Sequence, residues 1–388
     1  MSGFLKIALL LGKDLGYCRG VMRGIQQFTP ASSRWVYHDV APDIAEVDSL
    51  KEWNPAGIIA HLYRRDVARM VARLDKPVVN VTYTLTDLKL PLVEVDHVAV
   101  GRMAAEYLMQ RGLRNFGFFG SRSAGFSRLR RRGFRERLAR SGFRCANCDA
   151  EFWPQLQPGT SWMAMDVRVL DWLRGLPKPV GLLASNDVPA RQLAEVCRQS
   201  GLRVPEDIAL LGVDNDDLEC SLSYPPLSSI AIPAERIGYE AAALLDQMLS
   251  GSQPPRQAKL LPPVNVVTRH STDVLAIADP ELVAAIRYIH DHANGGLTVE
   301  ALLRAVPMAR RTLEKRFRKV LGRSPLEEIR RIQVQRVQQL LVDTNLSVAA
   351  IAQRAGFETS QRLAVVFRDE TGLTCSAYRR QFRADEFA

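Results

Sequence analysis

One pattern of apolar, basic and glycine positions occurs twice near the end of this chain. Residues Leu297–Val299 align with Leu346–Val348 at an offset of 49, and residues Leu313–Gly322 align with Leu363–Gly372 at an offset of 50. Because the offset grows by one inside each unit, we expect the second copy to have a turn one residue longer. A short helix, a tight turn and a basic helix, present in two copies, predict two helix-turn-helix units. Duplex DNA is the partner that this predicts.

Charge is concentrated in the same segment. The net charge is +10, and residues 280–388 contain 18 Lys and Arg against 12 Asp and Glu. A basic excess favours a polyanionic partner. At 388 residues, with 47% hydrophobic and 24% charged residues, the chain is long enough for two or three globular domains.

Several classes of protein are disfavoured by what the sequence contains. The early apolar run Ile7–Leu11 is too short for a signal peptide or a membrane span, so we expect a cytoplasmic protein without membrane contact. Cys145 and Cys148 form a lone CxxC, which we interpret as reduced thiols, with a metal or redox site as the alternative. No Walker loop, HExxH or GxSxG occurs, so we predict neither an enzyme nor a cofactor.

The front part of the chain alternates strand-like and helix-like segments. Buried strands are predicted at 6–12, 56–62, 76–82, 114–120, 180–187 and 207–215, with a final strand at 264–272, and helices lie between most of them. Continuous apolar strands alternating with helices predict parallel sheets covered on both faces. We therefore expect a two-lobed α/β domain over residues 1–272, a short linker over 273–279, and an all-α double helix-turn-helix domain over 280–388. Asp279-Pro280 suits a helix start.

In parallel sheets, ligands bind beyond the carboxyl ends of the strands. The polar residues expected there are Tyr17, Arg19, Asn186, Asp214 and Asn215, and the arginine-rich segment 126–140 adds Arg130. Carboxylate, amide and guanidinium groups can each grip two neighbouring hydroxyls, so these residues predict a polyol site. The alternatives are a turn or helix cap at the Asn and Asp pairs, and a solvated helix face or a second DNA surface for the arginines.

In a helix-turn-helix, early residues of the second helix meet the bases. The first such helix begins near Ala309 and the second follows Glu358, whereas Leu313, Phe317, Leu363 and Phe367 are assigned to the core. A capping box at Ser324 starts a long helix to about Asp343 that joins the units. The predicted DNA-binding residues are Arg310, Arg311, Lys315, Arg316, Thr359, Ser360, Gln361 and Arg362.

Two families share these motifs. The tail resembles an AraC-type DNA-binding domain at Gly356-Phe357, Phe367, Gly372 and Tyr378-Arg379, although Leu363 and Cys375 depart from the usual pattern. The front part resembles the periplasmic-binding-protein-like sensor of the lactose/galactose-repressor class at 93–108, 185–215 and 225–230. That resemblance implies that Arg130, Asn186 and Asp214 hold the hydroxyls of an inducer.

The order of the two domains, with the DNA-binding segment behind the sensor, resembles that of regulators of pentose operons. This implies an activator that binds D-xylose or a related sugar, acts as a homodimer on promoter DNA and works with RNA polymerase. A sensor of a purine or a phosphorylated metabolite is the main alternative. An enzyme acting on a sugar or nucleotide is the second.

Overall fold

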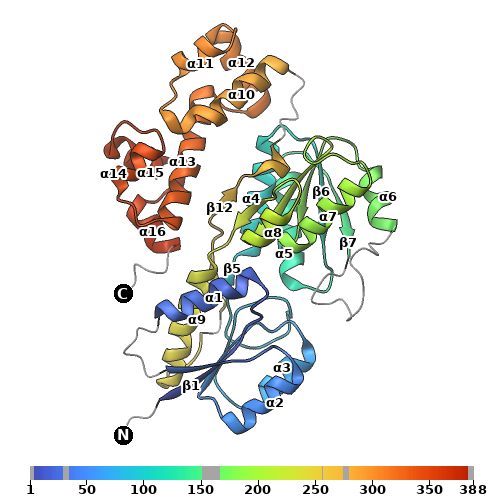
Figure 1. Cartoon of the computed structure of the whole chain (residues 1–388), viewed down its shortest axis with the longest axis vertical. Helices are drawn as coiled ribbons and strands as arrows, with labels where there is room; N and C mark the ends of the chain where they lie inside the picture. The colour runs from blue at the N-terminus through green and yellow to red at the C-terminus, as the bar shows by residue number, and fades with distance from the viewer. Residues whose placement is uncertain (1–3, 29–34, 151–166, 256, 274–278, 383–388) are drawn as a thin grey trace.

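The first lobe is a parallel sheet whose strands alternate between two apolar faces. The computed structural model describes residues 4–28, 35–150, 167–255, 257–273 and 279–382 (Figure 1). Ile7 and Leu9 of β1 (Leu5–Leu10) point to one core cluster, and Ala8 and Leu10 point to another. The sheet order is β2-β1-β3-β4, with β2 at Trp35–Asp39, β3 at Gly57–Ala60 and β4 at Val78–Asn80. Helices α1 (Gly16–Phe28) and α9 (Ala234–Leu249) cover the first face, and α2 (Ile44–Trp53) and α3 (Arg65–Arg73) cover the second.

The second lobe is a six-stranded sheet in the order β12-β10-β9-β8-β6-β7. Its strands are β6 (Asn115–Gly120), β7 (Cys145–Asp149), β8 (Val180–Ala184), β9 (Ile208–Asp214), β10 (Ser228–Ala231) and β12 (Asn265–Val267). Its helices are α4 (His97–Gln110), α5 (Gly125–Ala139), α6 (Val167–Gly175), α7 (Asp187–Gln199) and α8 (Asp217–Leu222). The two-lobed α/β prediction is confirmed.

The last strand differs from its prediction over 264–272. β12 ends at Val267 and pairs antiparallel with β10, and a 3₁₀ turn follows at His270–Thr272. The turn forms because short hydroxyl side chains compete with the strand ladder for backbone partners. Ser271 Oγ donates to Leu210 O at 2.6 Å, and Ser228 N–H donates back to Ser271 Oγ at 2.8 Å.

Two glycines allow α4 and α5 to touch through their backbones. A Cβ atom on Gly101 would lie 2.0 Å from Arg130 O, and one on Gly133 would lie 2.0 Å from Val98 O. Neither position can accept a side chain without moving the helices apart. This close contact fixes the position of α5, the helix that bears Arg130.

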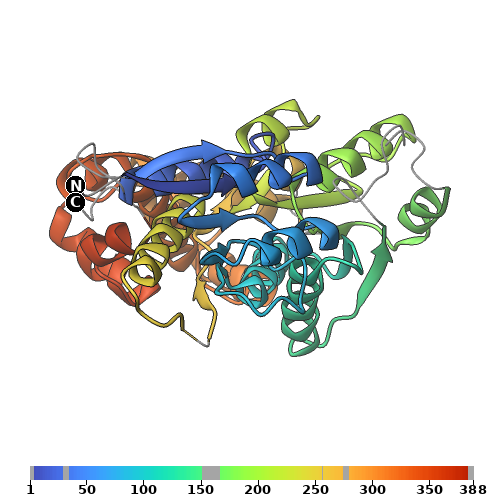
Figure 2. The same ribbon diagram turned by 90° about the horizontal axis from the view of Figure 1, so that it is seen from below.

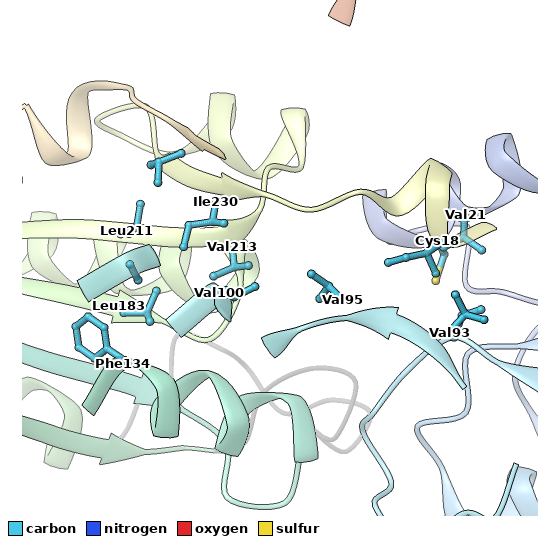
Figure 3. Close-up of a cluster of buried hydrophobic side chains, with 14 of the residues drawn as sticks. Cys18, Val21, Val93, Val95, Val100, Phe134, Leu183, Leu211, Val213 and Ile230 are labelled. Atoms are coloured by element: carbon cyan, nitrogen blue, oxygen red, sulfur yellow. The ribbon is translucent and has the colours of Figure 1, made fainter. Parts of the chain in front are cut away.

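Within the described ranges, three segments cross between the lobes. The first contains β5 (Val93–Val95), the second joins β10 to α9, and the third runs from β11 (Lys259–Leu261) to β12. β5 and β11 pair in parallel beside the lobe junction. Figure 3 shows Val95 lying between apolar side chains of the first lobe and those of the second, so one core continues across the crossing.

The carboxy-terminal domain contains two helix-turn-helix units. α10 (Pro280–His292) and α11 (Val299–Ala305) precede α12 (Arg310–Leu321), and α13 (Pro325–Asp343) leads to α14 (Val348–Arg354), α15 (Ser360–Thr371) and α16 (Cys375–Phe382). The turn between α14 and α15 is one residue longer than that between α11 and α12, as predicted. The capping box at Ser324 is present, and Gly322 and Gly372 end their helices at φ +73° and +74°.

The long helix α13 holds the two units together and against the sensor. Gln333 Nε2 donates to Ala293 O at 3.1 Å and to Gly356 O at 2.9 Å, which links both units to α13. Val264, on the third crossing, is 6% exposed because it packs into the core of the second unit. Tyr378 Oη donates to Val264 O at 3.0 Å. Figure 1 shows α10, α11 and α12 at one end of the long axis of the molecule and the first lobe at the other, and Figure 2 shows the red helices of the second unit on the side opposite the green α6.

A candidate ligand cleft and a candidate DNA interface

A cleft lies between the lobes, beyond the carboxyl ends of strands from both sheets. Its volume is about 90 Å³. Four predicted ligand residues, Tyr17, Arg130, Asn186 and Asp214, line it. The other lining residues include His61, Thr82, Thr84, Glu94, His97, Phe126, Asp187, Asp216, Glu219 and Ile232.

Two predicted ligand residues do not line this cleft. Arg19 Nη1 donates to Lys13 O at 2.8 Å and to Asp14 O at 3.0 Å, and Nη2 lies 3.4 Å from Asp216 Oδ2, so Arg19 contacts a cleft residue without lining the cleft itself. Asn215 lines a separate groove that faces the helical domain. Asp214 and Asn215 form a turn with φ values of +107° and +55°. Asp214 lines both the cleft and this groove, whereas Asn215 lines only the groove. Asn215 therefore fits the turn interpretation, while Asp214 lines the cleft and stays a predicted ligand residue.

Arg130 occupies the centre of the cleft wall. It is 3% exposed, and its guanidinium donates to Asp214 Oδ1 at 3.1 Å, to Ser185 O and, through Nε, to His97 Nδ1 at 3.3 Å. A solvated helix face does not describe this arginine. It does describe Arg132, which is exposed and paired with Glu136.

Glu94 and His97 are cleft residues that the sequence analysis did not single out. Glu94 is 3% exposed, and its carboxylate accepts hydrogen bonds from Tyr83 N–H at 3.1 Å and Val95 N–H at 3.0 Å. Tyr17 Oη lies 3.3 Å from it and also donates to Val81 O at 2.6 Å, so Tyr17 offers mainly its ring face. The sequence signal that could have identified Glu94 is a charged residue between the two apolar residues Val93 and Val95.

The hydrogen bond from Arg130 sets the tautomer of His97. An arginine Nε–H only donates, so His97 Nδ1 must accept and the proton of the neutral ring lies on Nε2. Burial lowers the pKa of His97, which keeps the ring neutral at pH 7. His97 Nε2 has no hydrogen-bond partner among the described residues, since Glu94 Oε2 is 3.7 Å away. The ring therefore offers a buried donor to a ligand.

Carboxylates dominate the charge of the cleft. Burial raises the pKa of Asp214 to about 6 against the opposing pull of Arg130, and burial beside Asp214 raises the pKa of Asp187 well above its usual range. Burial also acts to raise the pKa of Glu94, but His97, the Val95 N–H and Arg130 outweigh it, and the pKa is lowered. At pH 7 Glu94 and most of Asp214 are ionised, whereas burial favours the protonated form of Asp187.

The exposed face of α12 carries part of the predicted DNA-binding set. Arg311 and Lys315 are exposed, and Arg310 is exposed with Glu300 and Glu314 at 3.4 and 3.3 Å. Arg316 differs from the prediction. Its Nη1 binds Asp279 at 2.9 Å and Glu281 at 2.8 Å, so the guanidinium is directed at the start of α10.

The exposed face of α15 presents Gln361 and Arg362 to solvent. Thr359 caps the helix, since its hydroxyl accepts the Arg362 N–H at 3.1 Å, and Ser360 is half-buried. Val365 lies on the same face and is 55% exposed, although an apolar residue gave no signal of a DNA contact in the sequence. The predicted core residues of both units, Leu313, Phe317, Leu363 and Phe367, are fully buried.

Comparison with known proteins agrees with both halves of the chain. A periplasmic binding protein-like domain matches residues 105–272, and a helix-turn-helix domain matches residues 302–381. The xylose operon regulatory protein of Escherichia coli K12 is 32% identical over 96% of this chain and 96% of its own length. The chain belongs to the family of xylose operon regulatory proteins.

Two further relatives match this chain over nearly its whole length. The xylose operon regulatory protein of Haemophilus influenzae is 29% identical over 97% of this chain and 98% of its own. A solved structure of the xylose-binding transcription activator xylR matches with a TM-score of 0.61 at 30% identity, covering 97% of this chain and 98% of that one.

The two cysteines of the CxxC do not form a shared site in this regulator. They lie three residues apart on β7, and successive side chains of a strand point to opposite faces. Cys145 packs against one core cluster and Cys148 against another. Burial raises the pKa of Cys145 to about 12, which makes it a poor nucleophile. Separately, none of the described helices is both long and apolar enough to cross a membrane.

Proposed function

We propose that this chain is a sugar-responsive transcription activator of pentose utilisation genes, with D-xylose as its effector. The observation that carries this proposal is the contact between Val264 and Tyr378. The segment that crosses between the lobes is hydrogen-bonded into the core of the second helix-turn-helix unit. A ligand that closes the lobes moves this crossing, and with it the DNA-binding domain.

The charges of the cleft favour a neutral polyol. Five acidic side chains, Glu94, Asp187, Asp214, Asp216 and Glu219, line it against one arginine among the described lining residues. A phosphorylated metabolite would meet this negative excess, whereas hydroxyls can donate to the carboxylates and accept from the arginine. We therefore set the phosphorylated-metabolite alternative aside for this cleft.

Size and shape point the same way. The cleft volume is about 90 Å³. Because one water molecule occupies about 10–15 Å³ on the same measure, the cleft holds several water-sized groups, which suits a monosaccharide. Arg130, Asn186, Asp214, Glu94 and His97 would hold the hydroxyls. The rings of Tyr17 and Phe126 would cover the C–H faces of the sugar.

The proposed activator works as a homodimer in the cytoplasm, engages RNA polymerase at the promoter, and binds its ligand without transforming it. We assign the subunit contact to α8 and the turn after it. Leu218, Leu222 and Tyr224 are 58%, 70% and 75% exposed, and together they make an apolar patch. A second copy of the chain can cover this patch with the same patch across a two-fold axis.

Thermal-shift measurements with D-xylose, D-ribose, D-glucose, adenine and glucose 6-phosphate test the effector. We expect D-xylose to raise the Tm most, since a ligand that binds only the folded state stabilises it. Asp214→Asn should abolish that rise while leaving the far-ultraviolet circular dichroism unchanged. A rise with adenine or the sugar phosphate and none with any sugar would overturn the proposal.

A further inference from the structure

A second, basic cleft lies where the helical domain meets the second lobe. β12 forms one wall and α13 forms the other, and the volume between them is about 440 Å³. Five basic side chains line it: Arg111, His290, Arg331, Arg336 and Arg354. No aspartate or glutamate is found among its described lining residues.

One buried carboxylate serves most of the cations on the helical side. Glu328 is 1% exposed and binds Arg331 at 2.7 and 3.0 Å, His290 at 3.3 Å, and Arg323. Arg331 Nη1 and Arg323 Nη2 are buried, and neither has a hydrogen-bond partner in the part of the chain that the structure describes. One carboxylate cannot neutralise two guanidinium groups, so positive charge remains in excess at this wall.

The sensor lobe adds a second buried cation from the opposite side. Arg111, the residue that ends α4, is 4% exposed. Its Nε donates to Thr272 O at 2.8 Å, and the guanidinium lies 3.9 Å from the centre of the Tyr107 ring. A carbonyl and an aromatic ring do not cancel a full charge. Arg111 forms no ion pair among the described residues, and the carboxylates that act on its charge, Glu328 and Asp273, do so only at longer range, so an anion between the domains would offset the cost of burying this charge.

The arginines on the outer face of α5 provide a contrast. Arg131 is paired with Asp149, Arg132 with Glu136 and Arg137 with Glu106. Each of these arginines is neutralised by a neighbouring carboxylate, as is usual on a solvated helix face. The interdomain cleft has no such carboxylates in its lining, and it is formed by two domains rather than one.

We propose that the cleft between β12 and α13 binds a small phosphate-bearing anion, either inorganic phosphate or a phosphorylated metabolite. The anion would accept charge-assisted hydrogen bonds from Arg111 on the sensor and from Arg331 and Arg354 on the helical domain. It would brace the two domains against each other. A cleft of about 440 Å³ is far too small to hold a DNA duplex, so we assign the phosphate to a small molecule. This site is separate from the sugar cleft and does not depend on the proposed effector.

Calorimetric titration of the full chain with inorganic phosphate and with glucose 6-phosphate tests this site, at an ionic strength held constant with chloride. Binding heat is preferred to a Tm shift because phosphate also stabilises proteins by exclusion from their surface. We expect saturable binding that Arg354→Gln weakens by about tenfold, the usual order for one charge-assisted contact. Arg132→Gln, on the paired face of α5, should bind as the unmodified chain does.

Arg111→Lys is a second variant. It keeps the positive charge but loses the planar guanidinium that can donate two parallel hydrogen bonds, so it should also weaken anion binding. Tighter binding of glucose 6-phosphate identifies a metabolite as the ligand, and equal binding identifies free phosphate. An absence of saturable heat with both anions, or equal losses in Arg354→Gln and Arg132→Gln, would overturn the proposal. D-xylose binding should persist in Arg354→Gln, so failure of this site is distinguishable from failure of the sugar cleft.

Discussion

Replacing Tyr378 with Phe removes the hydrogen bond between the lobe crossing and the DNA-binding domain. The ring can stay in place, since it packs edge-on against Phe367 at 5.3 Å between centroids. The lost bond, 3.0 Å long and buried, contributes about 0.5–1.5 kcal/mol net. Coupling between an effector and DNA is typically about 1–3 kcal/mol. We therefore expect the coupling in Tyr378→Phe to fall by about 1 kcal/mol, or roughly fivefold in affinity ratio.

The assay measures the affinity for D-xylose by calorimetry, with and without saturating promoter DNA, because coupling is reciprocal. Tyr288→Phe is the matched control, since that tyrosine stacks on His292 in the first unit, away from the crossing. Both variants should bind sugar alone, and DNA alone, like the unmodified chain. An unchanged affinity ratio in Tyr378→Phe, with a folded second unit, would refute the coupling through Val264.

Three further results are expected. Burial raises the pKa of Asp214 to about 6, and its ionised carboxylate is the form that accepts hydrogen bonds from sugar hydroxyls, so the affinity for D-xylose should fall about tenfold from pH 7 to pH 5 by calorimetry. Arg311→Ala should reduce the slope of log affinity for DNA against log salt by about one, whereas Arg316→Ala should leave that slope unchanged and lower the Tm. Leu222→Asp should convert dimers to monomers in analytical ultracentrifugation, and a dimer that persists would move the subunit contact elsewhere.

The helical domain could be predicted from sequence because its signals are local. The capping box at Ser324, the glycines Gly322 and Gly372 and the apolar spacing of α13 each act within a few residues. The ion pairs of Arg316 could not be predicted because its partners, Asp279 and Glu281, lie 37 and 35 residues earlier. Periodicity places a side chain on a face of its helix, but it does not show which neighbouring helix covers that face.

The ligand cleft could be predicted only in part. Strand ends located Tyr17, Asn186 and Asp214, because parallel strands end at one edge of their sheet. Asn215 follows the same strand, yet two successive residues at positive φ turn it into another groove. Glu94 lies on a segment that crosses between the lobes and not at a strand end in either main sheet. The rule that ligands bind beyond the ends of parallel strands therefore could not identify it.

Contacts between the domains could not be predicted from the sequence. Val264 and Tyr378 are 114 residues apart, and neither differs from an ordinary core residue until the two domains are placed together. The same holds for Arg111 and Arg331, which belong to separate domains and line one cleft.

Fluorescence anisotropy of a labelled promoter duplex, selected by this protein from random DNA, measures whether sugar binding controls DNA binding. The titration is run with and without saturating D-xylose at one fixed salt concentration. A sugar bound between the lobes should tighten promoter binding by about 5- to 150-fold, the range that such coupling spans. Identical promoter affinities with and without a sugar that demonstrably binds the cleft would show that the cleft does not control DNA binding.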